Sequence, residues 1–301
     1  APNEYNIVSI DSGRVRMYQD AGLIQPIDVS KLSNYNKIGS FFRDHEYGKT
    51  PTGEKLHVPI VWGTQTITVN VAKIPPAKLA PYLSKDGKSI SLNILKAPEF
   101  KGQTAFFDES SNVTCISALN VGIKTPFNFG PGDWDKVAEE LYKWKSNART
   151  FTTGLDSEYN VLMNEDALIV LGGNDAILNL KLTDAGMRQS FKQYPMTEGT
   201  ICWIDGWVIT KPTTGASLDL ALKYMDYMIG DQGQAELANL VGFGIVNSAG
   251  AKGFNPNVLH KDATWWYGGD VSKFPVPLYI MVPEEDPGRR VELWNKVKAR
   301  P

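Results

Sequence analysis

The chain has 301 residues, 31 basic against 33 acidic side chains, a net charge of −2 and 42% hydrophobic residues. This length and composition predict a substantial core and about two domains, and they exclude a disordered polyelectrolyte or a histone-like nucleic-acid binder. No apolar run reaches the roughly 18 residues of a membrane-spanning helix. Two cysteines and three histidines are too few for the usual metal-site spacings, so neither a metal nor a cofactor is expected.

Strand-like and helix-like segments alternate along the chain without an internal repeat, which predicts an α/β protein. The expected strands are residues 5–10, 58–70 as one strand or as two with a bend at Gly63, 103–107, 167–171 and 200–210. The expected helices are residues 14–20, 133–145, 218–229, 232–240 and a last helix that begins at Asp286. Helices between strands favour parallel pairing, and parallel sheets bind ligands at the carboxyl ends of their strands.

Two of the expected helices have an apolar stripe with helical spacing. In the helix capped by Asp133, the buried side is expected to be Trp134, Val137, Ala138, Leu141 and Trp144, and the solvent side Glu139, Glu140, Lys143 and Lys145. In the last helix the expected buried stripe is Val291, Trp294 and Val297.

Trp203 and Asp205 stand two residues apart in the strand 200–210, so their side chains project from the same face. An aromatic ring beside a carboxylate suits an organic cation, because the ring face attracts positive charge and the carboxylate accepts a strong hydrogen bond from an ammonium group. The alternative from the pattern alone is a packed core tryptophan followed by a turn at Gly206.

Other polar or aromatic groups follow expected strands. After residues 103–107 comes a helix start in which Glu109 can face a cation while Asp108 or Ser110 caps the helix. Gly172 and Gly173 follow another strand but lack the lysine and the glycine spacing of nucleotide-binding loops. Residues 265–269, which include Trp266, can either close over a ligand or pack between domains. No nucleophile elbow, Cys/His pair or HExxH helix indicates catalysis.

Several segments in order resemble the periplasmic polyamine-binding proteins of ABC transporters, the spermidine and putrescine receptors. They are EGTICWIDGWVIT at 198–210, the following amphipathic helix, and ELANLVGFGIVNSAG at 236–250, preceded by matches at 5–8, 22–28, 58–64 and 98–102. The resemblance covers nearly the whole chain and implies a periplasmic protein, working as a monomer, that delivers a small-molecule ligand to a membrane permease.

The resemblance also implies a type II periplasmic-binding fold, with two α/β lobes, a hinge and a ligand cleft between the lobes that closes on the ligand. The first lobe would comprise residues 1–70 and 206–250, and the second residues 71–205 and 251–301. The crossovers would fall near Val69–Lys73 and Asp205–Trp207. Family members begin with a strand, a helix and a strand before the segment matching Tyr5, and that portion has no counterpart here.

The family's cation-binding residues map onto several positions of this chain. The Trp-x-Asp pair corresponds to Trp203 and Asp205, and an acidic pair to Glu109 and Asn112. The family's Pro-Ser-x-Tyr loop is replaced at residues 10–13 by a stretch containing Asp11 and Ser12, which exchanges an aromatic wall for a carboxylate. A family tryptophan corresponds to Gly172, and Trp266 or a neighbour is expected to supply the missing wall.

Two other functions remain open at this point. A receptor for another solute class, such as an amino-acid derivative, would use Arg14 or Arg16 to hold a carboxylate. An enzyme on the same fold is the third alternative, since fold does not determine function. The first residues lack the basic start and apolar stretch of a signal peptide, and a bridge between Cys115 and Cys202 is open.

Overall fold

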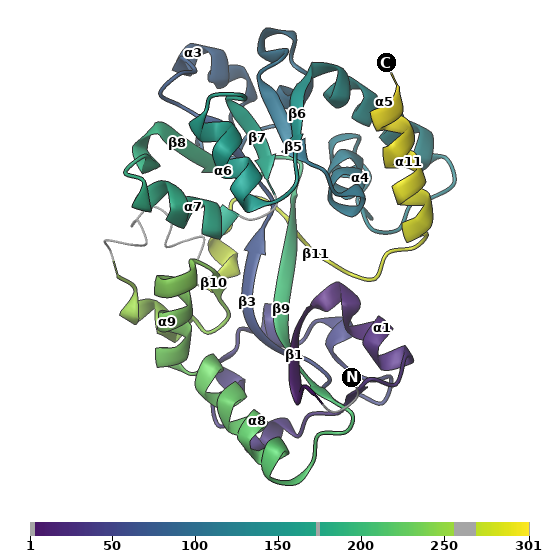
Figure 1. The fold of residues 1–301 in the computed structure, drawn as a ribbon, viewed down its shortest axis with the longest axis vertical. Coiled ribbons are helices and arrows are strands. Elements are labelled where there is room, and N and C mark those ends of the chain that lie inside the picture. Colours follow the sequence, from purple (N-terminus) through teal and green to yellow (C-terminus); the bar gives the residue numbers. More distant parts are fainter. Residues whose placement is uncertain (1–3, 173–174, 256–268, 301) are drawn as a thin grey trace. The chain divides into compact units, whose positions relative to one another are not determined.

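Two β-sheets organise the chain, and the contacts between residues divide it into two units. The structure is a computed structural model that describes residues 4–172, 175–255 and 269–300 (Figure 1). The first unit consists of Ala1–Gly63, Cys202–Phe274 and Ile280–Pro283, and the second of Thr64–Ile201, Pro275–Tyr279 and Glu284–Pro301. Both units are therefore discontinuous in sequence.

The sheet of the first unit has the strand order β1-β9-β3-β10, with β2 and β11 also paired to β9. Its strands are β1 (Ile7–Asp11), β2 (Ile24–Gln25), β3 (Val58–Thr64), β9 (Thr200–Thr210), β10 (Gly244–Ile245) and β11 (Leu278–Ile280). Its α-helices are α1 (Val15–Asp20), α2 (Ser40–Arg43), α8 (Gly215–Ile229) and α9 (Asp231–Val241). β1 runs antiparallel to β9 and β10 antiparallel to β3, so the expected parallel pairing does not describe these pairs.

One face of the β1–β9 pair carries a small apolar core. Ile10, Val15, Ile24, Leu56 and Val208 are buried together there. Successive side chains of a strand point to opposite faces of the sheet. Ile10 and Val208 therefore lie on one face, and Asp11 and Asp205, which are an odd number of residues away from them, lie on the other. The apolar core thus fixes which face of β9 receives the polar residues.

The sheet of the second unit has the order β6-β5-β7-β4-β8. Its strands are β4 (Thr66–Asn70), β5 (Thr104–Phe107), β6 (Ala148–Thr152), β7 (Ile169–Gly172) and β8 (Phe191–Tyr194). Its α-helices are α3 (Pro76–Leu79), α4 (Ser110–Asn120), α5 (Asp133–Asn147), α6 (Leu155–Met163), α7 (Asp175–Asp184) and α11 (Pro287–Ala299). β5 is parallel to β6 and β7, as the intervening helices predict, whereas β4 is antiparallel to β7 and β8.

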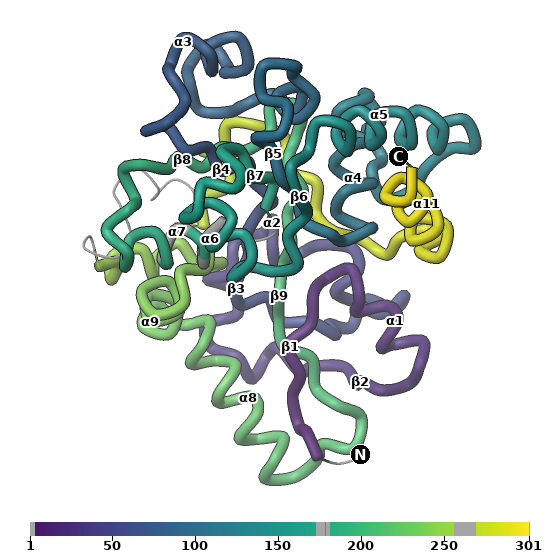
Figure 2. The backbone as a smooth tube through the Cα atoms, turned by 45° about the horizontal axis from the view of Figure 1, so that its top comes forward, coloured from purple at the N-terminus to yellow at the C-terminus, as the bar shows by residue number. Residues whose placement is uncertain are grey.

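Helices α4, α5 and α11 pack against one another in the second unit and lie side by side in both views (Figures 1 and 2). Phe106 of β5 and Phe151 of β6 contact Trp294 of α11, with ring centroids 5.8 and 5.3 Å apart. The helix nearest the carboxyl end of the chain is thereby joined to the sheet, because aromatic rings in edge contact bury large areas.

Two side chains of these helices lie differently from the expectation. The buried residues of α11 are Arg290, Trp294 and Val297, and Val291 is exposed, so the predicted stripe is wrong at its first position. Glu140 is buried instead of solvated, because its carboxylate accepts hydrogen bonds from Trp144 Nε1 at 3.0 Å and Lys96 Nζ at 2.6 Å. A buried charge with such partners avoids the cost of an unpaired one.

The observed units differ in extent from the expected lobes. The expected strand 58–70 is two strands that break at Gln65, and β4 belongs to the second unit because it pairs with β7 and β8. The chain leaves the first unit after Gly63 and returns at Cys202, not near Val69–Lys73 and Asp205–Trp207. The segment that follows β10 belongs to the first unit, where the 3-10 helix Ser248–Gly253 packs against α9.

Candidate functional site

In the first unit, two carboxylates stand opposite each other on neighbouring strands. The antiparallel register of β1 and β9 pairs Asp11 with Asp205, and directly opposite residues point to the same face with Cβ atoms about 5 Å apart. Gly13 N–H donates to Asp11 Oδ1 at 2.7 Å, whereas Asp11 Oδ2 is buried and no group of the described residues is close and aligned enough to donate to it. The sequence alone gave no sign of this register, and the structure brings the two predicted residues together.

Both carboxyl groups are harder to ionise than free aspartate. The pKa of Asp11 is raised to about 7, mainly by burial and also by the negative charge of Asp205, against the opposing effects of the Gly13 and Ile204 backbone and of the Arg14 charge. Burial also raises the pKa of Asp205, and the positive charge of Arg14 acts in the opposite direction. A bound cation would stabilise the ionised forms of both groups, which burial disfavours.

Trp203 lies two residues before Asp205, and it is 8% exposed. Its ring meets Phe243 edge to face, with centroids 5.4 Å apart, and it lies against Gly63, where a Cβ atom would be 2.2 Å from Trp203 Cζ2. The indole Nε1 is buried and donates to no group of the described residues. Trp203 is therefore packed like a core residue but retains a free hydrogen-bond donor.

A pair of buried histidines supports β1 beside Asp11. His57 Nε2 lies 3.2 Å from the Ile10 carbonyl, and His45 Nε2 lies 3.1 Å from His57 Nδ1. Burial lowers the pKa of His45 to about 4 and that of His57 to about 3, so both are neutral near pH 7. Since the carbonyl accepts, His57 donates from Nε2 and accepts at Nδ1, and His45 donates to it. No sequence signal indicated this pair.

The other predicted residues near Asp11 have structural partners or lie at the surface. Ser12 is buried, and its hydroxyl donates to the Met281 carbonyl at 3.0 Å. Arg16 is on the surface, 3.0 Å from Asp20, whereas Arg14 is exposed near the two carboxylates. Of the two arginines considered for a carboxylate ligand, only Arg14 is placed near the Asp11–Asp205 pair.

In the second unit, Glu109 is the N-cap of α4. Its carboxylate accepts from Ser111 N–H at 3.2 Å and Asn112 N–H at 2.7 Å, which satisfies free amides of the first turn. Asp108, expected as a capping residue, instead accepts from Trp294 Nε1 at 2.6 Å and Lys298 Nζ at 2.8 Å. The Asn112 side chain accepts from Gln65 Nε2 at 3.2 Å. Glu109 therefore caps the helix, as was expected of Asp108 or Ser110, and Asp108 is hydrogen-bonded to Trp294 and Lys298 instead.

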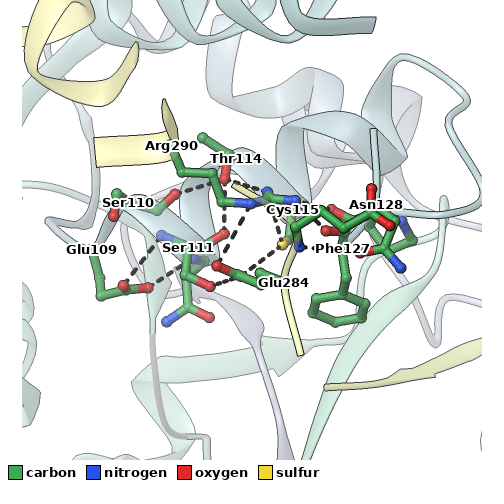
Figure 3. Close-up of polar contacts among 12 residues, drawn as sticks. Glu109, Ser110, Ser111, Thr114, Cys115, Phe127, Asn128, Glu284 and Arg290 are labelled. Atoms are coloured by element: carbon green, nitrogen blue, oxygen red, sulfur yellow. Dashed lines mark hydrogen bonds and ion pairs between the residues drawn. The ribbon is translucent and has the colours of Figure 1, made fainter. Parts of the chain in front are cut away.

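A buried arginine lies behind the same helix turn (Figure 3). Arg290 Nη1 donates to Thr114 Oγ1 at 2.8 Å, and Nη2 donates to the Phe127 carbonyl at 2.6 Å. Arg290 Nε is 3.6 Å from Glu284 Oε2, and Glu284 also accepts from the Ser111 hydroxyl. This network connects α11 to the first turn of α4, and the apolar spacing of α11 did not reveal it.

Two further residues of the second unit bear on the predicted site. At Gly172 a Cβ atom would lie 2.6 Å from Glu158 Oε2, and Glu158 is fully buried. A buried carboxylate therefore occupies space beside the glycine that corresponds to the family's tryptophan. Cys115 and Cys202 are both free and buried.

Trp266 lies outside the described residues. Within the described part, no group of three or more His, Cys, Asp or Glu side chains is placed to hold a metal ion. The helices of those same residues include none with the length and hydrophobicity needed to cross a membrane.

Comparison with known proteins shows the family to which the chain belongs. The family of bacterial extracellular solute-binding proteins matches residues 2–263, so this chain belongs to that family. The spermidine/putrescine-binding periplasmic protein of Salmonella typhimurium is 23% identical over 271 residues, covering 89% of this chain and 71% of that protein. The Escherichia coli protein of the same description is 22% identical, covering 85% and 67%.

Solved structures share the fold at lower identity. The spermidine/putrescine ABC transporter substrate-binding protein PotD from Streptococcus pneumoniae has a TM-score of 0.79 at 19% identity, covering 99% of this chain and 84% of that one. The GABA receptor Atu4243 has a TM-score of 0.69 at 17% identity, covering 99% and 82%. The expected type II periplasmic-binding fold is confirmed by the PotD structure.

Proposed function

We propose that this protein captures a small organic cation of the polyamine class outside the cytoplasmic membrane and delivers it, as a monomer, to the permease of an ABC importer. The observation that carries the proposal is the pairing of Asp11 with Asp205 on β1 and β9. Two partly buried carboxylates stabilise a bound ammonium group, because charge-assisted hydrogen bonds are strong where water is excluded.

Two further features support a cation over other solutes, and a third supports binding over catalysis. Trp203 lies on the same face of β9 as Asp205 and offers an aromatic surface. Spermidine and putrescine are the solutes named for the Salmonella and Escherichia coli relatives. The family to which the chain belongs consists of binding proteins, which argues for capture without chemical turnover.

The test is thermal unfolding against spermidine, putrescine, lysine, GABA and a neutral diol of putrescine's length. A ligand at about 100 times its dissociation constant adds about 2.7 kcal/mol, which raises the midpoint by a few degrees in a chain of this size. We expect a shift with a cation but none with the diol. Asp205→Asn should abolish the shift, and Asp219→Asn, which changes an exposed carboxylate on α8, should preserve it. A shift that survives in Asp205→Asn contradicts the proposal.

A second candidate is a receptor for an amino acid that carries a distant ammonium group. The observation that favours it is Arg14, whose positive charge acts on both Asp11 and Asp205. Arg14 would bind the carboxylate while the aspartates bind the ammonium group. The same panel separates the candidates, because Arg14→Gln should weaken GABA or lysine and strengthen putrescine.

A further inference from the structure

The Asp11–Asp205 pair has a property that a single binding carboxylate lacks. The register of β1 and β9 fixes the two side chains on one face, and among the described residues no group is close and aligned enough to donate to the buried Oδ2 of Asp11. Burial on this face disfavours the ionised form of both groups, and the charge of Asp205 adds to that effect on Asp11, so one of the two groups retains a proton at a pH where free aspartate is ionised.

The charged and titratable groups around the pair do not remove this effect. Arg14 is the basic side chain whose charge acts on both groups, and it is exposed to solvent, which screens it. His57 contacts the Ile10 carbonyl, and its burial keeps it neutral near pH 7. Gly13 N–H stabilises charge on Oδ1 and the backbone of Ile204 acts in the same direction, but the pKa of Asp11 is near 7 despite both.

We propose that Asp11 and Asp205 share one proton in the ligand-free receptor and release it to the solvent when a positively charged group of the ligand binds, so that capture exchanges a cation for a proton. The inference rests on the proposed function, since it requires a cationic ligand. The ammonium group replaces the proton as the compensating positive charge, and no covalent bond other than the carboxyl O–H is broken.

The exchange has consequences for selectivity. With the pKa of Asp11 near 7, binding releases about 0.9 proton at about pH 6 and less than about 0.1 at about pH 8.5. The association constant for a cation therefore rises up to about tenfold per pH unit below pH 7 and levels off above it. A neutral isostere has no charge to displace the proton, so discrimination against it increases with pH.

The first experiment needs no ligand. Carboxyl carbons of ¹³C-labelled protein are followed by NMR from about pH 4 to 9. We expect one aspartate to titrate near pH 7, to vanish in Asp11→Asn, and to shift down by about one unit in Asp205→Asn. Asp219→Asn is the control and should leave that titration unchanged. If all side-chain carboxyls titrate below about pH 5.5, no proton is shared and the inference is wrong.

The second experiment measures the exchange with spermidine and putrescine as probes. Calorimetric titrations at about pH 6 in two buffers with different ionisation enthalpies should differ by the heat of about 0.9 proton per ligand, and at about pH 8.5 they should agree. Binding with buffer-independent heat at pH 6 contradicts the exchange alone. No binding of either amine at pH 8.5, where both carboxylates are charged, contradicts the proposed function and the exchange with it.

Discussion

At the scale of single residues, the face of β9 that carries Trp203 depends on a glycine of β3. A Cβ atom at Gly63 would lie 2.2 Å from Trp203 Cζ2 and 2.6 Å from Cε2, so the indole must move or the strands must separate. We expect Gly63→Ala to lower the free energy of unfolding by about 1–3 kcal/mol and to weaken ligand binding. Urea unfolding and calorimetry measure the two effects.

The matched control for this substitution is Gly288→Ala in α11. No atom of the described residues lies within 4 Å of a Cβ atom there, and alanine is the better helix former, so stability should stay equal or rise. If Gly63→Ala is as stable as Gly288→Ala and binds normally, the indole is not held by that contact.

Asp11, a residue of the proposed binding site, lowers the stability of the folded chain. Its pKa is about 7 in the folded chain and 3.8 without perturbation, so the ionised form is disfavoured by folding. The cost is fully present above pH 7 and disappears as the pH falls from 7 towards 3.8. We expect Asp11→Asn to stabilise the ligand-free protein by about 2 kcal/mol at about pH 8 and by little at about pH 4.5.

Urea unfolding of the wild type and Asp11→Asn at both pH values checks this prediction, with Asp20→Asn on the surface of α1 as the control. A variant less stable than the wild type at pH 8 would show that Asp11 stabilises the fold.

Within the candidate site, the sequence predicted that Trp203 and Asp205 share a face, because they are two residues apart in a strand. The pairing of Asp11 with Asp205 was not predicted, because it requires the register between strands almost 200 residues apart.

At the scale of elements, the buried guanidinium of Arg290 connects α11 to neighbouring segments. Arg290 is 0% exposed and donates to Thr114, Phe127 and Pro126, and its guanidinium carbon lies 4.2 Å from the Phe129 ring centroid. We expect Arg290→Met to cost about 3 kcal/mol or more, because Glu284 and the carbonyls lose their buried partner. The neighbouring Arg289 is exposed over Trp134, so Arg289→Met should cost less than about 1 kcal/mol.

Thermal unfolding of both variants measures the difference, and equal midpoints would refute the anchoring role of Arg290.

The same helix shows what hydrophobic periodicity can and cannot predict. Its existence and its start near Asp286 were predicted correctly, as were Trp294 and Val297 on the buried face. A hydrophobic pattern cannot identify a buried arginine, since burial of that charge depends on carbonyls and a carboxylate brought by other segments. Glu140 on α5 escaped prediction for the same reason.

At the scale of the whole molecule, the two units differ in their titratable groups. His45 and His57 are buried in the first unit, and none of the three histidines of the sequence falls within the residue ranges of the second. Both have folded pKa values, about 4 and about 3, below the ordinary value of 6.5. Their contribution to stability is complete above pH 6.5 and is lost as the pH falls towards 4 and 3, because the unfolded chain binds the protons.

Asp11, also in the first unit, has the opposite effect on stability as the pH falls from 7 towards 4. The folded state binds the Asp11 proton at a higher pH than the unfolded chain does, so acid stabilises the fold through this group. Two histidine protons against one aspartate proton leave a net loss on the order of 2 kcal/mol at about pH 4.5. We expect hydrogen exchange, corrected for its intrinsic pH dependence, to show protection lost in β1, β3 and residues 202–210 while β5 and β7 remain protected.

Asp11→Asn supplies the control for this experiment. It removes the opposing proton, so the first unit should become more sensitive to acid in the variant than in the wild type, although the variant is the more stable protein at pH 8. Equal loss of protection in both units would show that acid unfolds the chain as a single cooperative body. Equal acid sensitivity of the two proteins would show that the aspartate proton does not offset the histidines. The proposed ligand site and the acid stability of the first unit are thus linked through one carboxyl group, since Asp11, which we propose binds the cation, also moderates the effect of the buried histidines.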